Sequence, residues 1–456
     1  MPDTNIKRAE SLDDLWKVLD PQPLRTSPEL QAFYRDDLNK VRGTGATKQL
    51  QLELLRRHGS TKFRCLLYGN QGCGKSTEIN KILQEVEGKF RAVHVSIAQE
   101  LNPSSFQVFD ILLLILFRLV EEVRKLQNEQ FLPSLGVPES LWREIVEYLE
   151  WTSSKKGSTT TRFNAKGTAD VFGFAKGEIQ YAAGRNHEVI NYRLQRLSHL
   201  ADRVNTLADA ANRYLADHHG EREWLIVIED LDKQGISSAA IREVLIEHSA
   251  LLENLRLHLI LNVPAWMVWS ADSTRLPFGP NRFQMPDVPV YEAHHAPCEK
   301  GRNALREVLR ARVNPDLFSD DQEDRCIVAS GGNLRDMFAI VTKASTIASI
   351  HERTSIDGSD VDLAVGELRS RYGTALGDNP FDKDPIPYEE KIGRLVAVYN
   401  QAGELASRHD RCLNALLKAG AVLRFNGEGR YGVHPLVVDL LHKYGTLKAN
   451  NLGGSL

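Results

Sequence analysis

The chain contains a glycine-rich octet that fits the pattern G-x-x-x-x-G-K-[ST]. The octet reads Gly69-Asn70-Gln71-Gly72-Cys73-Gly74-Lys75-Ser76. A short apolar run over 63–68 precedes it, and from Lys75 onward apolar residues recur at helical spacing until Gly88. A strand, a glycine-rich turn and a helix, followed by a second strand over 90–95, predict an α/β fold with a parallel sheet.

The octet is predicted to bind the phosphates of a nucleotide. Glycines let successive backbone N–H groups turn inward, and the following helix adds the positive end of its dipole. We expect the cofactor-binding residues to run from Gly69 through Thr77, with Lys75 at the β- and γ-phosphates and Ser76 on Mg²⁺. Cys73 is interpreted as a tolerated small residue. The competing interpretation, a chance glycine-rich turn, is disfavoured because motif and context occur together.

A second apolar run, Trp224–Ile228, ends in the acidic residues Glu229, Asp230 and Asp232. By position, we expect Glu229 to complete the Mg²⁺ shell and Asp230 to orient the attacking water as general base. Asp232 is expected to support either of them. Acidic residues are common where strands end, so this stretch alone says little, but its combination with the octet favours a catalytic role.

Other apolar runs predict the remaining strands. Leu257–Leu261 is a candidate core strand, and Val288–Tyr291 is a candidate fifth strand. Residues 97–223 are predicted to form a mostly helical insertion, with a long amphipathic helix over 191–217. Within it, the stretch 152–184 is rich in Lys, Gly, Ser and Thr and is interpreted as a mobile insertion or an extended ribbon. Its basic residues could contact phosphates, although a charge run more often only faces solvent.

Together these residues resemble the additional-strand P-loop ATPases of the AAA+ and STAND groups. In particular they look like bacterial AAA-family ATPases that carry a G-x-x-G-x-G-K-S-T-E loop, here Gly69 to Glu78. The other stretches that carry the resemblance are Phe33-Tyr34-Arg35, Val41-Arg42-Gly43, Ile228 to Lys233, Ser330 to Asp336, Asn426-Gly427-Glu428 and Val433-His434-Pro435. The resemblance implies a P-loop core of the additional-strand type with a helical lid, and ATP with Mg²⁺ as cofactors.

The resemblance also implies two further catalytic residues. Asn262 follows the strand over 257–261 and matches the sensor-one position, which hydrogen-bonds the γ-phosphate or the attacking water. Arg335 matches the sensor-two position, where a lid arginine reaches the γ-phosphate and couples lid closure to the nucleotide state. Both roles suit a reaction whose transferred phosphoryl charge needs preorganised donors. In isolation, Asn262 could simply end a strand and Arg335 could be a surface arginine.

The second motif departs from the family pattern. AAA+ ATPases commonly end it with Asp and then Glu, whereas this chain has Glu229 and then Asp230. The shorter Asp230 side chain would lie about one methylene farther from the water, and misplacement of that size can cost about a hundredfold in rate. Hydrolysis is therefore expected to be slow. Such folds also receive an arginine finger from a neighbouring subunit, for which the unranked candidates are Arg306, Arg310 and Arg312.

The end of the chain predicts a winged-helix-like module. A short helix over 411–419 precedes two strand-like runs, 421–425 and 430–433, which flank the hairpin signal Asn426-Gly427-Glu428-Gly429. Basic residues in this region that could meet DNA phosphates are Arg408, Arg411, Lys418, Arg424 and Arg430. Given the net charge, packing on the core or contact with another protein is favoured over DNA binding.

At about 150 residues per domain, a chain of 456 residues predicts two or three domains. We expect an N-terminal extension at 1–26, an ATPase core at 27–290 that contains the insertion at about 97–223, a helical lid at 291–377, a linker at 378–385, and a winged-helix-like module with its tail at 386–456. The linker prediction depends on three prolines within 378–387, which exclude a helix interior.

Charge and hydropathy limit the partners. Acidic residues outnumber basic ones by 60 to 57, so no global positive field is available to hold nucleic acid nonspecifically. The most apolar run, Ile111–Phe117, is far shorter than the roughly 20 residues that span a bilayer, and no membrane contact is expected. The charged N-terminus lacks a secretory signal, and five scattered cysteines suit a reducing compartment, so we expect a cytoplasmic protein.

The sequence thus predicts a Mg²⁺-dependent ATPase switch that couples ATP hydrolysis to conformational change or oligomerisation. Its expected partners are ATP and either further copies of the chain or a protein effector. The resemblance suggests a bacterial setting such as phage defence or stress signalling. Two alternatives stay open: a nonhydrolysing nucleotide-gated scaffold, favoured if Glu229 and Asp230 are inert, and a DNA-binding initiator or loader, favoured if the C-terminal basic residues form one stripe.

Overall fold

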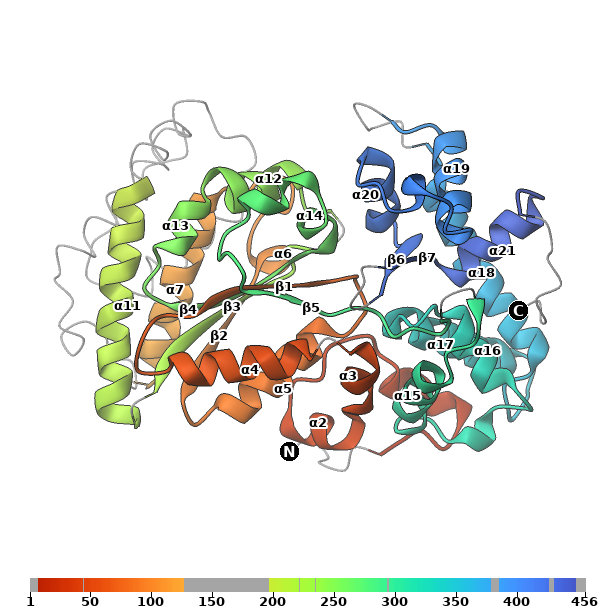
Figure 1. Cartoon of the computed structure of the whole chain (residues 1–456). Helices are drawn as coiled ribbons and strands as arrows, with labels where there is room; N and C mark the ends of the chain where they lie inside the picture. The colour runs from red at the N-terminus through yellow and green to blue at the C-terminus, as the bar shows by residue number, and fades with distance from the viewer. Residues whose placement is uncertain are drawn as a thin grey trace, which may run out of the picture.

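Five parallel strands form the central sheet of the structure, a computed structural model that describes residues 7–43, 45–126, 197–220, 222–233, 235–292, 295–378, 385–425 and 430–447 (Figure 1). The strands are β1 Arg64–Gly69, β2 Phe90–Ser96, β3 Glu223–Glu229, β4 His258–Pro264 and β5 Arg282–Gln284. Their order is β2-β3-β4-β1-β5. Strand β4 lies between β1, which leads into the octet, and β3, which ends at Glu229. This is the additional-strand arrangement, so the predicted α/β P-loop fold is confirmed.

The fifth strand is not where the sequence predicted it. Strand β5 is only three residues long, and the predicted strand Val288–Tyr291 forms none. Val288 and Val290 are buried in the hydrophobic cluster of the lid, and Val288 donates its N–H to the Gly332 carbonyl at 3.4 Å. Apolar runs indicate burial, but they do not distinguish burial in a sheet from burial against helices.

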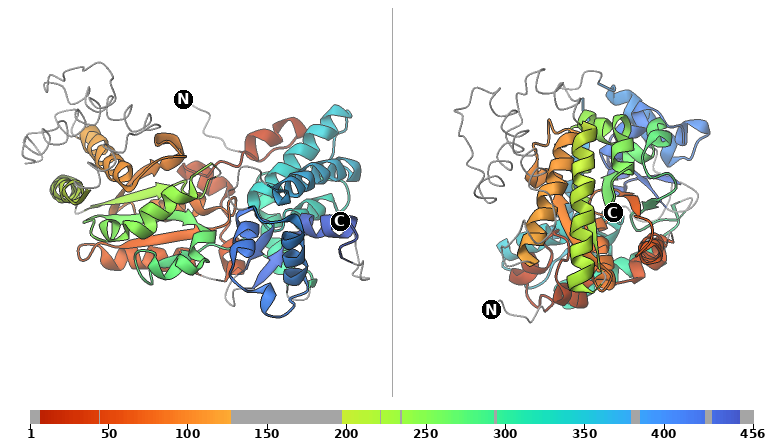
Figure 2. Two further views of the ribbon diagram at one scale, coloured as in Figure 1. Left: turned by 90° about the horizontal axis from the view of Figure 1, so that it is seen from above. Right: turned by 90° about the vertical axis from the view of Figure 1, so that its left-hand side faces the viewer.

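Helices cover both faces of the sheet (Figures 1 and 2). Successive strand residues point to opposite faces, so in β1 Leu67 packs toward the octet-bearing helix while Leu66 packs on the opposite side. The core helices are α4 Ala46–Arg57, α5 Lys75–Val86, α6 Ile97–Glu100, α7 Val108–Leu126, α11 Leu197–His219, α12 Ser238–Arg242, α13 Ser249–Glu253 and α14 Ala265–Val268. Apolar side chains on both faces are typical of a parallel sheet.

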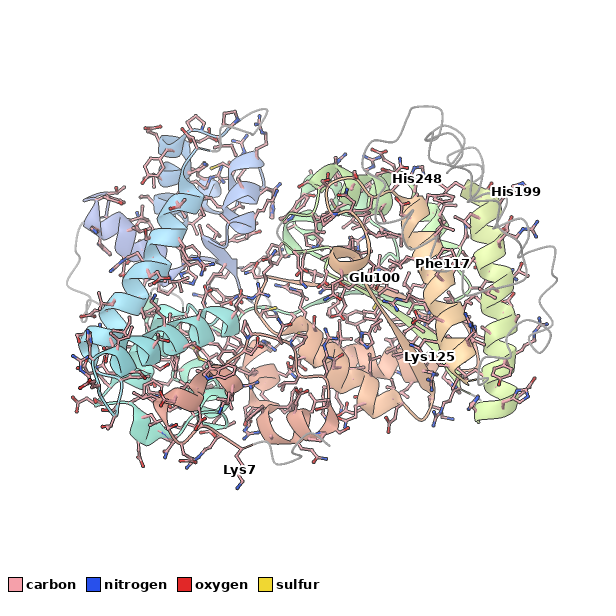
Figure 3. All side chains as sticks on the ribbon, turned by 180° about the vertical axis from the view of Figure 1, so that it is seen from behind. Lys7, Glu100, Phe117, Lys125, His199 and His248 are labelled. Carbon is pink, nitrogen blue, oxygen red and sulfur yellow. The ribbon has the colours of Figure 1, made fainter. Side chains whose placement is uncertain are left out.

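The described parts of the predicted insertion are mostly helical, as the sequence predicted. Helices α7 and α11 lie side by side over the sheet, and Figure 3 shows Phe117 on α7 beside the helix that carries His199. The basic stretch predicted at 152–184 lies outside the described residues. Among the helices that the structure describes, α7 included, none is both long and apolar enough to cross a membrane.

Four helices form the lid, and the N-terminal segment packs with them. The lid helices are α15 Glu299–Arg310, α16 Gln322–Ala329, α17 Leu334–Ile350 and α18 Gly358–Leu376. The helices before the sheet are α1 Leu15–Val18, α2 Ser27–Phe33 and α3 Asp37–Arg42. Leu12 and Leu15 are buried in the lid cluster, and the Ala9 N–H donates to the Arg312 carbonyl at 2.7 Å. Of the residues expected to form an N-terminal extension, Ala9, Leu12 and Leu15 thus belong to the buried core of the lid.

The C-terminal elements are α19 Tyr388–Tyr399, α20 Arg411–Lys418, β6 Val422–Arg424, β7 Tyr431–Val433 and α21 Pro435–Lys443. Strands β6 and β7 are antiparallel, so the predicted hairpin is confirmed, while its turn at 426–429 and most of the predicted linker lie outside the described residues. Helix α20 packs on α14 of the core and α21 packs on α18 of the lid (Figure 1).

Candidate nucleotide-binding site

The octet lies at the edge of the sheet where the carboxyl ends of the parallel strands meet. It joins β1 to α5, which begins at Lys75. Gly72 and Gly74 have φ of 84° and 100°, a left-handed conformation that glycine adopts at little cost. At Gly69, a Cβ would lie only 2.1 Å from the Met285 carbonyl oxygen, so the chain after β5 leaves room for glycine alone.

Lys75 is held inside the octet. Its Nζ lies 2.7 Å from Asp232 Oδ2 and donates to the carbonyl oxygens of Gly69 at 2.9 Å and Asn70 at 2.8 Å. The Lys75 side chain is 4% exposed. Burial lowers the pKa of this ammonium, but the Asp232 carboxylate and other acidic groups around it together raise the pKa above its usual value. The loop therefore holds a fixed positive charge beside an acidic residue of the second motif.

Ser76 and Glu229, the two predicted Mg²⁺ ligands, meet across the octet. The Glu229 carboxylate lies 3.2 Å from His94 Nδ1 and near the Ser76 hydroxyl. Burial raises the pKa of Glu229, but His94, Ser76 and Arg25 together outweigh burial and leave the pKa below its usual value. A hydroxyl and an ionised carboxylate are hard oxygen ligands of the kind that Mg²⁺ takes.

Asp230 has a backbone that side-chain-bearing residues rarely adopt. Its φ is 75°, a left-handed value that is uncommon outside glycine and enriched at functional sites. Ser96, at the end of β2, donates its hydroxyl to Asp230 Oδ2, and Lys233 Nζ lies 3.0 Å from Oδ1. The carboxylate is thus fixed on both oxygens at the same edge of the sheet as the octet.

Asn262 lies in β4 beside the octet. It is opposite Leu67 of β1 in the sheet register, two residues before the octet begins at Gly69. Its side chain is buried, and its Oδ1 has no hydrogen-bond partner among the described residues. An unsatisfied buried amide oxygen costs about 1–3 kcal/mol, which a bound ligand or water would offset.

The lid reaches the octet through the first turn of α17. Arg335 donates its backbone N–H to the Gly72 carbonyl at 3.3 Å, and a Cβ added at Gly72 would lie 2.7 Å from the Arg335 Cβ. Asn333 caps α17 by accepting hydrogen bonds from the N–H groups of Arg335 and Asp336. Its Nδ2 donates to the Gln71 carbonyl at 2.6 Å. Lid and octet are therefore in direct contact.

The side chains of Gln71 and Cys73 in the octet, and of Thr77 directly after it, face protein. Gln71 Nε2 donates to the backbone carbonyl of Asp232. Cys73 is buried, with its Sγ 3.4 Å from the Met285 carbonyl oxygen, and burial raises the pKa of its thiol. Thr77 Oγ1 accepts the N–H of Leu24 at 3.2 Å. These contacts fix the loop from outside and leave ligand binding to the backbone, Lys75 and Ser76.

The residues present fit a Mg²⁺–nucleotide. In the part of the chain that the structure describes, no group of three or more His, Cys, Asp or Glu side chains could hold a metal ion by itself. Mg²⁺ commonly binds one or two protein oxygens and completes its shell with water and substrate phosphates. Ser76 and Glu229 supply such a pair, and the Asn262 oxygen, for which the described part of the chain offers no partner, lies close by in the sheet register.

Sequence reasoning missed three side chains at this site. His94 and Ser96 end β2, and the register pairs Ser96 with Glu229, so the rule that parallel strands end at one edge would have found both. Asp287 binds Asn70 of the octet at 2.6 Å. No sequence signal indicated Asp287, because the preceding strand is only three residues long and was predicted elsewhere.

The three candidate arginine fingers are engaged within the chain. Arg312 is buried between the rings of Phe33 and Phe338, and burial lowers its pKa to about 10. Arg306 pairs with Asp324, and Arg310 lies 2.6 Å from a Glu323 oxygen. Arg310, with 44% of its side chain exposed, is the most accessible of the three.

No protein family model matches the sequence, and no curated protein matches it. Similar solved structures cover nearly the whole chain. They include the ORC1 protein of Aeropyrum pernix in complex with DNA, at 13% identity over 94% of this chain and 96% of that one, with a TM-score of 0.37. The Walker-type ATPase paby2304 of Pyrococcus abyssi is 11% identical over 93% and 99% of the two chains, with a TM-score of 0.39. The RuvB Holliday junction branch migration motor of Thermotoga maritima is 11% identical over 94% and 100%, with a TM-score of 0.38. At such TM-scores the superposition is loose, so the fold assignment depends on the strand order described above.

Proposed function

We propose that this chain is a Mg²⁺-dependent ATPase switch of the AAA+ type, which binds and hydrolyses ATP and couples the nucleotide state to its helical lid. The observation that supports this function best is the position of Lys75. Its ammonium is buried at the N-terminus of α5, inside a glycine-built loop, and pairs with Asp232 beyond the end of β3. A phosphate group would replace Asp232 as the partner of this cation, while the glycine-built turn and the N-terminus of α5 are already shaped to bind an anion.

Each residue of the site has a role in this proposal. Ser76 and Glu229 would hold Mg²⁺, which neutralises charge on the β- and γ-phosphates during transfer. Asp230 is the general base. Ser96 holds its Oδ2, and its Oδ1 would take the proton from the attacking water after release of the half-exposed Lys233, which pairs with Oδ1 in this structure.

Two further side chains would sense the γ-phosphate. Asn262 orients the attacking water or the γ-phosphate from β4, and Arg335 approaches the γ-phosphate from the lid. The direct contact of Arg335 with Gly72 supports this role, because nucleotide in the octet would meet the first turn of α17. A bound ATP would therefore act on the lid as well as on the core.

The lid turn also touches the C-terminal module, which gives the switch an output. His434 precedes α21, and its Nε2 donates to the Ser330 carbonyl at 3.1 Å while its Nδ1 accepts the Leu436 N–H. Burial lowers the pKa of His434, which keeps the imidazole neutral. The ring stacks on Tyr372, whose hydroxyl donates to Asp336 at 2.7 Å. A movement of the turn that carries Arg335 would thus be transmitted to the C-terminal module.

The basic residues of this winged-helix-like module favour packing over DNA binding. Arg424 lies over the ring of Trp269, Lys418 lies over Trp266, and Arg430 donates to the Tyr291 carbonyl at 3.1 Å. These three contacts support packing of the module on the core, whereas Arg408 and Arg411, the other two basic candidates, are exposed. The STAND-like subtype, oligomerisation through an arginine finger and a setting in phage defence or stress signalling depend on the sequence resemblance alone.

ATP titration of Lys75→Ala tests the proposed function. The variant should lose at least about tenfold in affinity, because it deletes a charged donor to the phosphates. Lys81→Ala is the matched control, since Lys81 lies on the same helix but pairs with Glu85. It should bind ATP like the parent. Equal affinity of parent and Lys75→Ala would refute the nucleotide site.

A further inference from the structure

One buried carboxylate, Asp287, contacts both the phosphate-binding octet and the lid. Asp287 is 1% exposed. Its Oδ2 accepts a hydrogen bond from Asn70 Nδ2 at 2.6 Å, and its Oδ1 accepts one from Asn333 Nδ2 at 3.1 Å. Asn70 is the second residue of the octet, and Asn333 is the N-cap of α17. A single side chain therefore joins the loop that would hold the phosphates to the helix that carries Arg335.

The chain around Asp287 leaves no space for independent movement of the loop and the lid. A Cβ at Gly69 would lie 2.1 Å from the Met285 carbonyl oxygen, and a Cβ at Gly332 would lie 1.6 Å from the Val288 carbonyl oxygen. The segment 285–288 is thus in backbone contact with the octet on one side and with the lid turn on the other. A shift of the lid turn has to move Asp287, the octet or both.

The geometry of Asn333 makes its hydrogen bond to Asp287 directional. Asn333 Oδ1 accepts the backbone N–H groups of Arg335 at 3.1 Å and Asp336 at 3.3 Å, so the amide cannot be turned around. Its Nδ2 must then face acceptors, which are Asp287 and the Gln71 carbonyl. Because the Asn333 amide caps α17, a contact that orients this amide also orients the first turn of the helix.

We propose that Asp287 is a positioning residue that sets the distance of Arg335 from the phosphate-binding octet. This inference depends on the ATPase function proposed above. It assigns to Asp287 control over the position of the lid. Asp287 touches no reacting atom and acts through Asn70 and Asn333. Losing it should affect ATP more than ADP, because only ATP carries the phosphate that Arg335 approaches.

The cost of this carboxylate supports a functional role. Burial raises the pKa of Asp287 to about 6, although Arg42, Lys75 and the two amide hydrogen bonds favour its charged form. A neutral side chain would satisfy packing with less loss of stability. A buried carboxylate that lowers stability is expected where function requires it.

Nucleotide titrations of four proteins test the proposal: the parent, Asp287→Ala, Arg335→Ala and the double variant. Each single variant should lower the ratio of ATP affinity to ADP affinity by at least about fivefold. The double variant should be no worse than the worse single variant, since Asp287 acts through Arg335. A parent-like ratio in Asp287→Ala, or additive effects in the double variant, would overturn the proposal.

Asp287→Asn is the conservative variant. Its amide oxygen can accept from Asn333, and Asn70 can rotate to accept from its amide N–H, so it should restore a parent-like ratio. If Asp287→Ala does not fold, Asn70→Ala removes only the contact with the octet and should still lower the ratio. An unchanged ratio in Asn70→Ala would then count against the proposal.

Hydrogen exchange without nucleotide separates this inference from the proposed function. Residues 330–336 should exchange faster in Asp287→Ala than in the parent, whether or not the protein binds ATP. Asp360→Ala is the matched control, because Asp360 is equally buried in the lid but contacts Arg353 and accepts the N–H of Asp357, the N-cap of α18. It should leave 330–336 and the affinity ratio unchanged. Protection of 330–336 that survives in Asp287→Ala would show that Asp287 does not hold the lid turn.

Discussion

Three residues at the edge of the sheet that carries the octet are held in states that cost stability. Asp230 has a left-handed backbone, Asn262 has a buried oxygen without a partner among the described residues, and Asp287 is a carboxylate in the interior. Each such state costs on the order of 1–3 kcal/mol. All three lie around one octet, which is where a protein that binds phosphate would need them.

At Asp230, the substitution Asp230→Asn should preserve ATP binding and lower turnover by about a hundredfold or more. The amide keeps the size of the side chain and loses the basic oxygen. Nucleotide affinity and phosphate release, measured on the same preparation, check this result. Turnover at the parent rate would assign the base to Glu229 or Asp232 instead.

At Asp287, the raised pKa predicts a pH-dependent stability. The folded state holds the proton more tightly than the unfolded chain does, with a pKa of about 6 against 3.8. Stability is therefore fully present below about pH 4 and falls by about 3 kcal/mol as the pH rises through 6. Asp287→Asn lacks this titration. Its free energy of unfolding, relative to that of the parent, should therefore be higher at pH 8 than at pH 4. Chemical denaturation at both pH values checks this. If the difference in free energy of unfolding between Asp287→Asn and the parent is the same at both pH values, the charge at Asp287 does not lower stability.

How far the sequence predicts such residues depends on how local their partners are. Lys75 and Ser76 follow from an eight-residue pattern, and Glu229 follows from the end of an apolar strand. Asp287 is 217 positions from Asn70 and 46 from Asn333, and the contacts that define it exist only after the lid folds onto the octet. Ser96 is intermediate in how well the sequence predicts it, because a correct strand register would have placed it beside Glu229.

At the scale of elements, long periodic segments were predictable and short ones were not. Helix α5 ends at Val86, as the spacing of its apolar residues predicts, and β3 and β4 follow from buried apolar runs. Strand β5 was predicted in the wrong place, because three residues carry too little pattern and because Val288 and Val290 are buried by lid helices. Their burial was predictable, but the element that covers them was not.

The contact between the octet and α17 predicts a steric effect of Gly72→Ala. The new Cβ would lie 2.3 Å from Asn333 Oδ1 and 2.7 Å from the Arg335 Cβ, so the lid turn must move. We expect ATP turnover to fall by about a hundredfold, as displacements near 1 Å do in active sites. Phosphate release measures the effect.

Gly220→Ala is the control for backbone strain. Gly220 has a similar φ of 79° and no neighbour within 4 Å of a new Cβ. Both variants should lose about 1–2 kcal/mol of stability from the left-handed backbone, but only Gly72→Ala should lose turnover. Equal turnover in the two variants would mean that the lid does not depend on this contact.

At the scale of the whole molecule, the parts are linked in a chain of contacts. The octet touches the lid turn through Asn333, the lid turn touches the C-terminal module through His434, and that module returns to the core through Arg424. Helix α14, where the module docks, directly follows the strand that carries Asn262. The octet is therefore connected to the C-terminal module from both the lid and the core.

The return contact through Arg424 leads to a prediction that separates packing from DNA binding. Arg424 lies 5.2 Å from the Trp269 ring and 5.5 Å from the Tyr431 ring, and its Nε has no hydrogen-bond partner among the described residues. A partly buried cation–π contact contributes about 1 kcal/mol. Arg424→Ala should therefore speed hydrogen exchange in residues 265–269 about fivefold. Arg408→Ala, an exposed arginine of the same module, should leave that exchange unchanged. If Arg424 served DNA instead, its loss would weaken binding of the chain to a DNA duplex and leave α14 as protected as in the parent.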